Sequence, residues 1–120
     1  MDISDEADGE HFAMNIELLY FDGCPLWETA LRNLRDACAL EGLTWPIELV
    51  EVRDEHEAAA QRFLGSPSIV VDGKDLWPES RNAYYLSCRM YRTPDGPRGW
   101  PTVEMLRERL RTVREADGWE

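Results

Sequence analysis

Apolar and polar residues along this chain follow two different periods, which predicts short strands alternating with helices. Residues 15–21 (NIELLYF) form a nearly continuous apolar run, which is typical of a strand covered on both faces. Four apolar side chains then recur at helical spacing, namely Trp27, Leu31, Leu34 and Cys38. We expect Cys24 and Pro25 to open this helix, because proline suits the first helical position, and Gly42 to end it.

Turn residues divide the rest of the chain in the same way. The elements expected are a strand at 46–52, a helix from the capping box of Asp54 and Glu57 to about Leu64, strands at 68–71 and 74–76 joined by the Asp72-Gly73 turn, and a helix at 102–114. The stretch 78–101 holds several prolines, glycines and tyrosines, with a turn signal at Asp95-Gly96, and is predicted to be a long irregular loop.

The resulting order is β-α-β-α-β-β-α, which predicts an α/β domain at 14–114 whose four-stranded mixed sheet is flanked by helices. The acidic segment 1–13 is expected to be a disordered tail, and 115–120 a short C-terminal tail. A length of 120 residues suits one domain.

Charge and composition narrow the classes of partner. The net charge of −11 disfavours nucleic acids and anionic membranes, because phosphate binding needs a surplus of lysine and arginine. No apolar run approaches the roughly 18–20 residues that span a bilayer, and residues 1–10 lack the apolar core of a secretory signal. We therefore expect a cytoplasmic protein. The histidines, His11 and His56, lie in acidic or charged segments, so no metal site built on them and no cofactor is expected.

Three cysteines carry the candidate chemistry, and in a reducing compartment they are expected to be thiols. Cys24 is the first candidate, because the free N–H groups and dipole at a helix start favour a thiolate. Asp22 and Glu28 oppose this effect, and the alternative is a cysteine that only packs. Cys38 lies on the apolar stripe of the same helix and is expected in the core.

Two segments sharpen the fold prediction. Residues 20–27 (YFDGCPLW) resemble the strand-to-helix turn of the thioredoxin active site, and residues 63–69 (FLGSPSI) resemble the segment that carries the cis-proline of that superfamily. With the element order, they give a resemblance to the thioredoxin-like superfamily over roughly 14–110. The nearest group is the small thioredoxin-like proteins of actinobacteria, some of which are labelled alkylmercury lyase-like.

The chain departs from the family pattern at two positions. The C-x-x-C motif reads Cys24-Pro25-Leu26-Trp27, so Trp27 stands where the resolving thiol would be. Leu18 stands where thioredoxin has a buried acid that assists proton transfer. The resemblance therefore implies the fold more strongly than it implies ordinary thioredoxin activity.

The resemblance also implies a substrate-binding edge around Cys24. A cis bond before Pro67 would present the backbone of Ser66 to an extended substrate, and Pro25 and Trp27 would border the same edge. The loop that holds Cys88 would lead back past this edge, which makes Cys88 a candidate resolving thiol. We expect Arg89 and Arg92 to offset local negative charge and favour its thiolate. The alternative is a thiol buried among Tyr84, Tyr85 and Tyr91.

Three functions follow from these residues. The first is thiol–disulfide exchange or reduction, in which Cys24 attacks a disulfide of a substrate protein, a peroxide-derived sulfenate or a small thiol adduct. Cys88 then resolves the intermediate. The second is a binding module in which the same thiols hold Hg(II), Cu(I) or a thiol ligand without turnover. The third is a non-catalytic thioredoxin-like adaptor, which such folds often build as a homodimer, with an apolar patch around Trp77 and Trp100.

Overall fold

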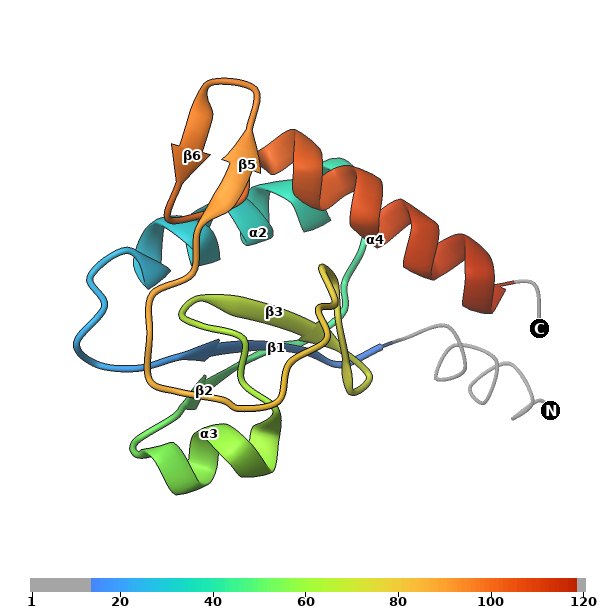
Figure 1. Cartoon of the computed structure of the whole chain (residues 1–120). Coiled ribbons are helices and arrows are strands. Elements are labelled where there is room, and N and C mark those ends of the chain that lie inside the picture. The colour runs from blue at the N-terminus through green and yellow to red at the C-terminus, as the bar shows by residue number, and fades with distance from the viewer. Residues whose placement is uncertain (1–13, 119–120) are drawn as a thin grey trace, which may run out of the picture.

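The computed structural model describes residues 14–118, so the predicted acidic tail at 1–13 lies outside the described residues. In chain order the elements are β1 (Ile16–Tyr20), α2 (Trp27–Leu40), β2 (Ile47–Glu51), α3 (Glu55–Gln61), β3 (Ser68–Val71), β4 (Lys74–Asp75), β5 (Tyr91–Thr93), β6 (Gly96–Arg98) and α4 (Val103–Gly118) (Figure 1). Strands and helices thus alternate through the first half of the chain, as the apolar pattern predicts.

The first four strands form one mixed sheet in the order β2-β1-β3-β4. Strand β1 is parallel to β2 and antiparallel to β3, and in this register Leu18 lies between Leu49 and Ile69. Strand β4 adds a short antiparallel edge to β3. The prediction of an α/β domain with a four-stranded mixed sheet is confirmed.

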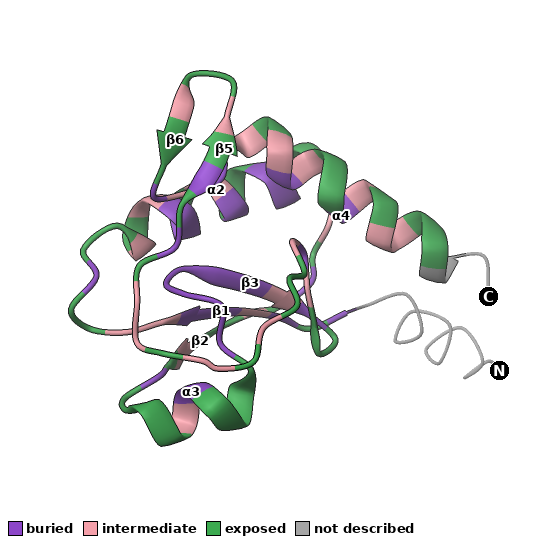
Figure 2. Cartoon of the chain, viewed as in Figure 1, coloured by how far each residue is buried: buried purple, intermediate pink, exposed green. Residues whose placement is uncertain are grey.

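Helices cover both faces of this sheet, with α2 and α4 on one face and α3 on the other (Figure 1). The larger core lies against α2 and α4, and its fully buried side chains include Ile16, Leu18, Leu34, Ile69, Leu106 and Leu110. The smaller core lies against α3 and consists of Leu19, Val52, Ala58 and Phe63. Burial therefore follows the sheet, while the outer surface of α3 is mostly exposed (Figure 2).

Local signals explain the start of α3, but the start of α2 was predicted wrongly, and α3 ends at Gln61, before the predicted Leu64. Helix α2 begins at Trp27, not at Cys24-Pro25, and its N-cap residue Leu26 makes no side-chain hydrogen bond. Cys24 therefore lies in the turn before the helix. At α3 the Asp54 carboxylate accepts the Glu57 N–H at 2.8 Å, as the capping box predicts.

Two C-terminal elements also differ from the prediction. The stretch expected to be an irregular loop contains the hairpin β5–β6, whose turn is Pro94-Asp95, one residue before the predicted Asp95-Gly96 turn. Helix α4 continues to Gly118, four residues beyond the predicted end at 114, so the tail predicted to begin at 115 is helical there. Within residues 14–118, no helix is long and apolar enough to cross a membrane.

Candidate thiol site

Cys24 lies at the end of a turn that follows β1, and its side chain is buried. The turn is closed by a hydrogen bond of 3.1 Å from the Cys24 N–H to the carbonyl of Phe21. The residue is only 1% exposed, and its Sγ donates to the carbonyl oxygen of Ser66 at 3.5 Å. The predicted position of this sulfur at the first turn of the helix is therefore wrong, and its polar contact is with the loop before β3.

Ser66 joins the two segments that the sequence singled out. It is fully buried, its Oγ accepts the Phe21 N–H at 3.3 Å, and its carbonyl accepts from Cys24. The Ser66–Pro67 peptide bond is cis, the geometry expected at this position, and the Pro67 ring is fully buried. The turn of Cys24 and the loop of Pro67 thus lie in direct contact.

A third segment, residues 87–89, lies along Ser66, and we call it the strap. The Ser66 N–H donates to the Ser87 carbonyl at 2.7 Å, and the Arg89 N–H donates to the Ser66 carbonyl at 2.9 Å. These two bonds form a parallel bridge between Ser66 and Cys88. Both backbone polar groups of Ser66 are therefore already bonded to the chain itself.

Cys88 is exposed at the centre of the strap, next to Cys24. A side-chain hydrogen bond with Cys24, followed by burial and the charge of Cys24, raises the pKa of the Cys88 thiol. This interaction requires the two thiols to be neighbours in space, although they are far apart in the sequence. The alternative in which Cys88 is buried among tyrosines does not hold, because the residue is exposed.

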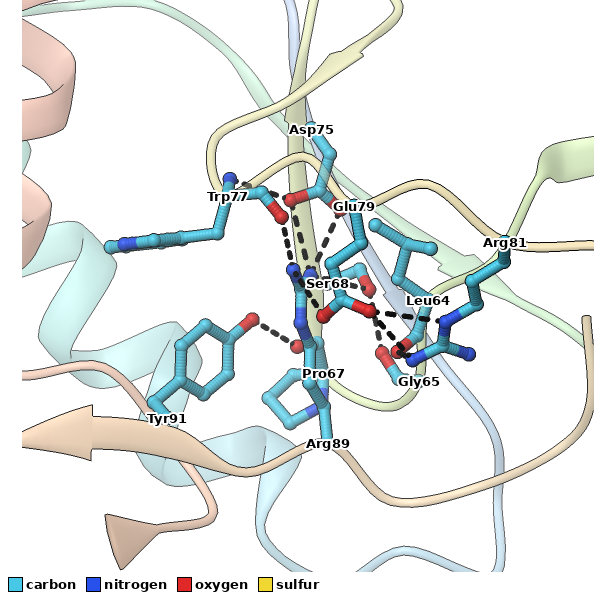
Figure 3. A network of polar contacts seen from close by, with 10 residues as sticks. All are labelled: Leu64, Gly65, Pro67, Ser68, Asp75, Trp77, Glu79, Arg81, Arg89 and Tyr91. Atoms are coloured by element: carbon cyan, nitrogen blue, oxygen red, sulfur yellow. Dashed lines mark hydrogen bonds and ion pairs between the residues drawn. The ribbon is translucent and has the colours of Figure 1, made fainter.

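The side chain of Arg89 anchors the strap to the edge of the sheet (Figure 3). The residue is 5% exposed, and its Nη1 donates to Asp75 Oδ2 at 2.9 Å and to Ser68 Oγ at 3.2 Å. Its Nη2 donates to the carbonyl of Trp77. The expectation that Arg89 favours a thiolate at Cys88 is wrong, because this cation is paired with Asp75 and the pKa of Cys88 is raised.

Neighbouring groups complete this anchor. Burial raises the pKa of Asp75, while the charge of Arg89 and a hydrogen bond from the Trp77 backbone oppose the rise. Tyr91 Oη donates to the Pro67 carbonyl at 2.6 Å, and the Arg89 guanidinium lies 5.0 Å from the centroid of the Tyr91 ring. Figure 3 shows the Tyr91 hydroxyl directed at Pro67, whereas the Arg89 guanidinium is directed at Asp75 and the Trp77 carbonyl.

The remaining candidates lie around the site or away from it. Pro25 is exposed beside Cys24, whereas Trp27 is half-buried and stacks on Tyr20 with ring centroids 4.4 Å apart. Cys38 is buried in the core as predicted, and burial raises its pKa to about 11. Trp77 and Trp100, which were expected to form an apolar surface patch, pack against the larger core and are half-buried.

Sequence reasoning missed the anchoring role of Arg89 and its partner Asp75. An arginine in a loop is normally solvated, so nothing local indicates that this one is buried. The glycine before Ser66 was a usable signal, because Gly65 has φ +116° and packs on the Arg89 backbone. Among residues 14–118, no cluster of three or more His, Cys, Asp or Glu side chains is arranged to hold a metal ion.

No protein-family model matches this sequence, and a search of curated proteins finds no match to it either.

Proposed function

We propose that this chain is a thioredoxin-like thiol protein in which Cys24 and Cys88 reversibly form one disulfide during thiol–disulfide exchange. The observation that carries the proposal is that both cysteines lie against Ser66: Cys24 Sγ donates to the Ser66 carbonyl at 3.5 Å, and Cys88 forms a parallel bridge with Ser66. The third cysteine, Cys38, is buried in the helical core and takes no part.

The order β2-β1-β3-β4, with β1 parallel to β2 and antiparallel to β3, supports the thioredoxin-like assignment. The placement of Cys24 after β1 and of Pro67 before β3 supports it further. A reducing cytoplasm is the compartment in which such a thiol pair would be regenerated.

The exposure of the two thiols favours an order of reaction opposite to the one expected from the sequence. Cys24, which we expected to attack first, is buried, whereas Cys88 is open to solvent. In the proposed reaction the Cys88 thiolate attacks an external disulfide RSSR, forms a Cys88–SR bond and releases one RS⁻. The Cys24 thiolate then attacks the Cys88 sulfur and releases the second RS⁻. Two electrons pass to the external disulfide, which leaves as two RSH, and the protein retains a Cys24–Cys88 disulfide.

Variants that each lack one of the three cysteines test this order directly. Reduced protein is mixed with oxidised glutathione, quenched with acid at successive times and mapped by peptide mass spectrometry. We expect C24S to accumulate glutathione on Cys88, because the resolving thiol is missing. We expect C88S to react much more slowly, and C38S to match the unmodified protein. Equal reaction of glutathione with Cys24 and Cys88 in the two variants would overturn the assignment.

The same thiol contact supports a second candidate function, the binding of a soft cation. Two adjacent thiolates are suitable ligands for Cu(I) or Hg(II), which prefer sulfur. Titration of the reduced protein with Cu(I) against a competing chelator tests this candidate. Tight binding that is lost in both C24S and C88S, together with no disulfide exchange, would favour metal binding over redox work.

A further inference from the structure

The strap is held by few interactions of its own backbone. Two hydrogen bonds join it to Ser66, and both lie within one bridge. The residues that precede it, from Trp77 onward, form no strand or helix up to β5. Backbone pairing of this kind is too short to hold an exposed segment in place, because isolated pairs of strands are only marginally stable.

The side chain of Arg89 makes further contacts that hold the strap in place. The Arg89 guanidinium contacts the Ser68 hydroxyl of β3, the Asp75 carboxylate of β4 and the Trp77 carbonyl of the following loop (Figure 3). Glu79 adds a longer ion pair at 3.6 Å. The planar fork of arginine suits such a set of acceptors, and a lysine would satisfy fewer of them.

Close packing fixes the strap from beneath. A Cβ atom added to Gly65 would lie 3.0 Å from Arg89 Cβ and 3.2 Å from Arg89 Cα, so the backbone of the strap rests directly on Gly65. Since Cys88 is the residue next to Arg89, the position of its thiol depends on the seating of Arg89.

We propose that Arg89 is a positioning residue that, through Asp75, holds the strap on Ser66 and so keeps Cys88 over Cys24. This inference rests on the proposed thiol function and names the group that sets its geometry. Release of the guanidinium from Asp75 lets the strap lift, which exposes Cys24 and separates the two sulfurs. Arg89 acts through the strap and touches no reacting atom.

Native alkylation of the reduced protein tests the seating of the strap without any redox step. Iodoacetamide is added under native conditions, and the modification of each cysteine is followed by peptide mass spectrometry. In the unmodified protein we expect rapid labelling of Cys88 and slow labelling of Cys24. In D75N the rate at Cys24 should rise about tenfold or more, which corresponds to an opening made easier by about 1.4 kcal/mol.

A matched control separates positioning from general loss of stability. Glu41 is also a carboxylate paired with arginine: it binds Arg107, Arg111 and Arg114 between α2 and α4, and none of these contacts involves the strap. We expect E41Q to lower the melting temperature without faster labelling of Cys24. Equal labelling of Cys24 in D75N and E41Q, at matched stability, would overturn the inference.

A second variant and a second readout complete the test. R89K keeps the charge and loses the fork, so Cys24 labelling should lie between the unmodified protein and D75N. In glutathione buffers, the Cys24–Cys88 disulfide of D75N should be about tenfold less favoured than that of the unmodified protein. If the unmodified protein forms no such disulfide, the proposed function fails, whereas the labelling result still decides the role of Arg89.

Discussion

Replacement of Gly65 by alanine is the sharpest structural perturbation of the thiol site. The new Cβ would lie 3.0, 3.2 and 3.3 Å from the Cβ, Cα and N atoms of Arg89, closer than side chains normally pack. Two of these three atoms belong to the backbone, so they cannot move aside without moving the strap. Gly65 also has φ +116°, a conformation that alanine rarely adopts.

These two effects give the expected decrease in the free energy of unfolding of G65A. Forcing extra volume into a packed site costs about 1–3 kcal/mol, and a non-glycine residue in an unfavourable backbone region costs about 1–3 kcal/mol. Their sum is about 2–6 kcal/mol, a large part of the roughly 5–15 kcal/mol that stabilises a small domain. A strap that shifts away from Gly65 relieves the contact part of this cost, and it also uncovers Cys24.

G73A is the matched control for G65A. Gly73 has φ +85°, but a Cβ at this position would meet no atom within 4 Å. Only the backbone part of the cost applies there, about 1–3 kcal/mol. Urea unfolding gives the two free energies, and native alkylation gives the exposure of Cys24. We expect G65A to be the less stable variant and the only one in which Cys24 is labelled faster. Equal loss of stability with Cys24 protected in both would refute the packing argument.

Three further predictions concern single groups. The hydrogen bond from Arg107 lowers the pKa of Glu41 in the folded state. Ionised Glu41 therefore stabilises the fold at pH values above the ordinary glutamate pKa of about 4.3. This stabilisation is lost as the pH falls below that value and through the folded-state pKa. Urea unfolding should therefore show E41Q less stable than the unmodified protein at neutral pH, and a gap of constant size in acid would contradict the assignment. Since the pKa of Cys88 is raised, its alkylation rate should still increase with pH above the ordinary thiol pKa of about 8.5. The rate is measured by quenching the reaction at successive times and by peptide mass spectrometry. A plateau below that pH would argue against the contact with Cys24. Y91F removes the 2.6 Å hydrogen bond from the Tyr91 hydroxyl to the buried Pro67 carbonyl. Thermal unfolding should therefore show a free energy of unfolding that is lower by about 1–3 kcal/mol. An unchanged stability would mean that water replaces the hydroxyl.

The apolar pattern predicted the sheet and its helices well, because burial on the two faces of β1 dictates which residues occupy it. The hairpin β5–β6 was missed for the opposite reason. Its strands, Tyr91–Thr93 and Gly96–Arg98, include arginines and a proline and show no alternation of apolar and polar residues. Only the Asp95-Gly96 signal marked it, one residue beyond the observed Pro94-Asp95 turn, and a turn alone does not predict the strands on either side. The start of α2 was predicted too early because of Pro25. A proline that suits the first turn of a helix also suits the turn before the helix.

The candidate site was predictable where its signals are local. Cys24 after an apolar strand and Ser66-Pro67 before another strand are short motifs, and the structure brings these two segments together. The anchor of the strap is a long-range arrangement instead. Arg89 is buried only because Asp75, 14 positions earlier, and the Trp77 carbonyl meet its guanidinium at the sheet edge. No pattern within the 78–101 stretch encodes that meeting, so the sequence led us to expect Arg89 beside the Cys88 thiolate instead of in an ion pair with Asp75.

A redox titration of the unmodified protein tests most directly whether Cys24 and Cys88 form a reversible disulfide. The protein is equilibrated in glutathione buffers of increasing oxidising strength, acid-quenched, alkylated and digested without reduction. We expect a single cross-linked pair of peptides containing Cys24 and Cys88, formed and removed reversibly, with Cys38 alkylated only after denaturation. Both thiols recovered free, or carrying only glutathione, across the whole range would contradict the proposal.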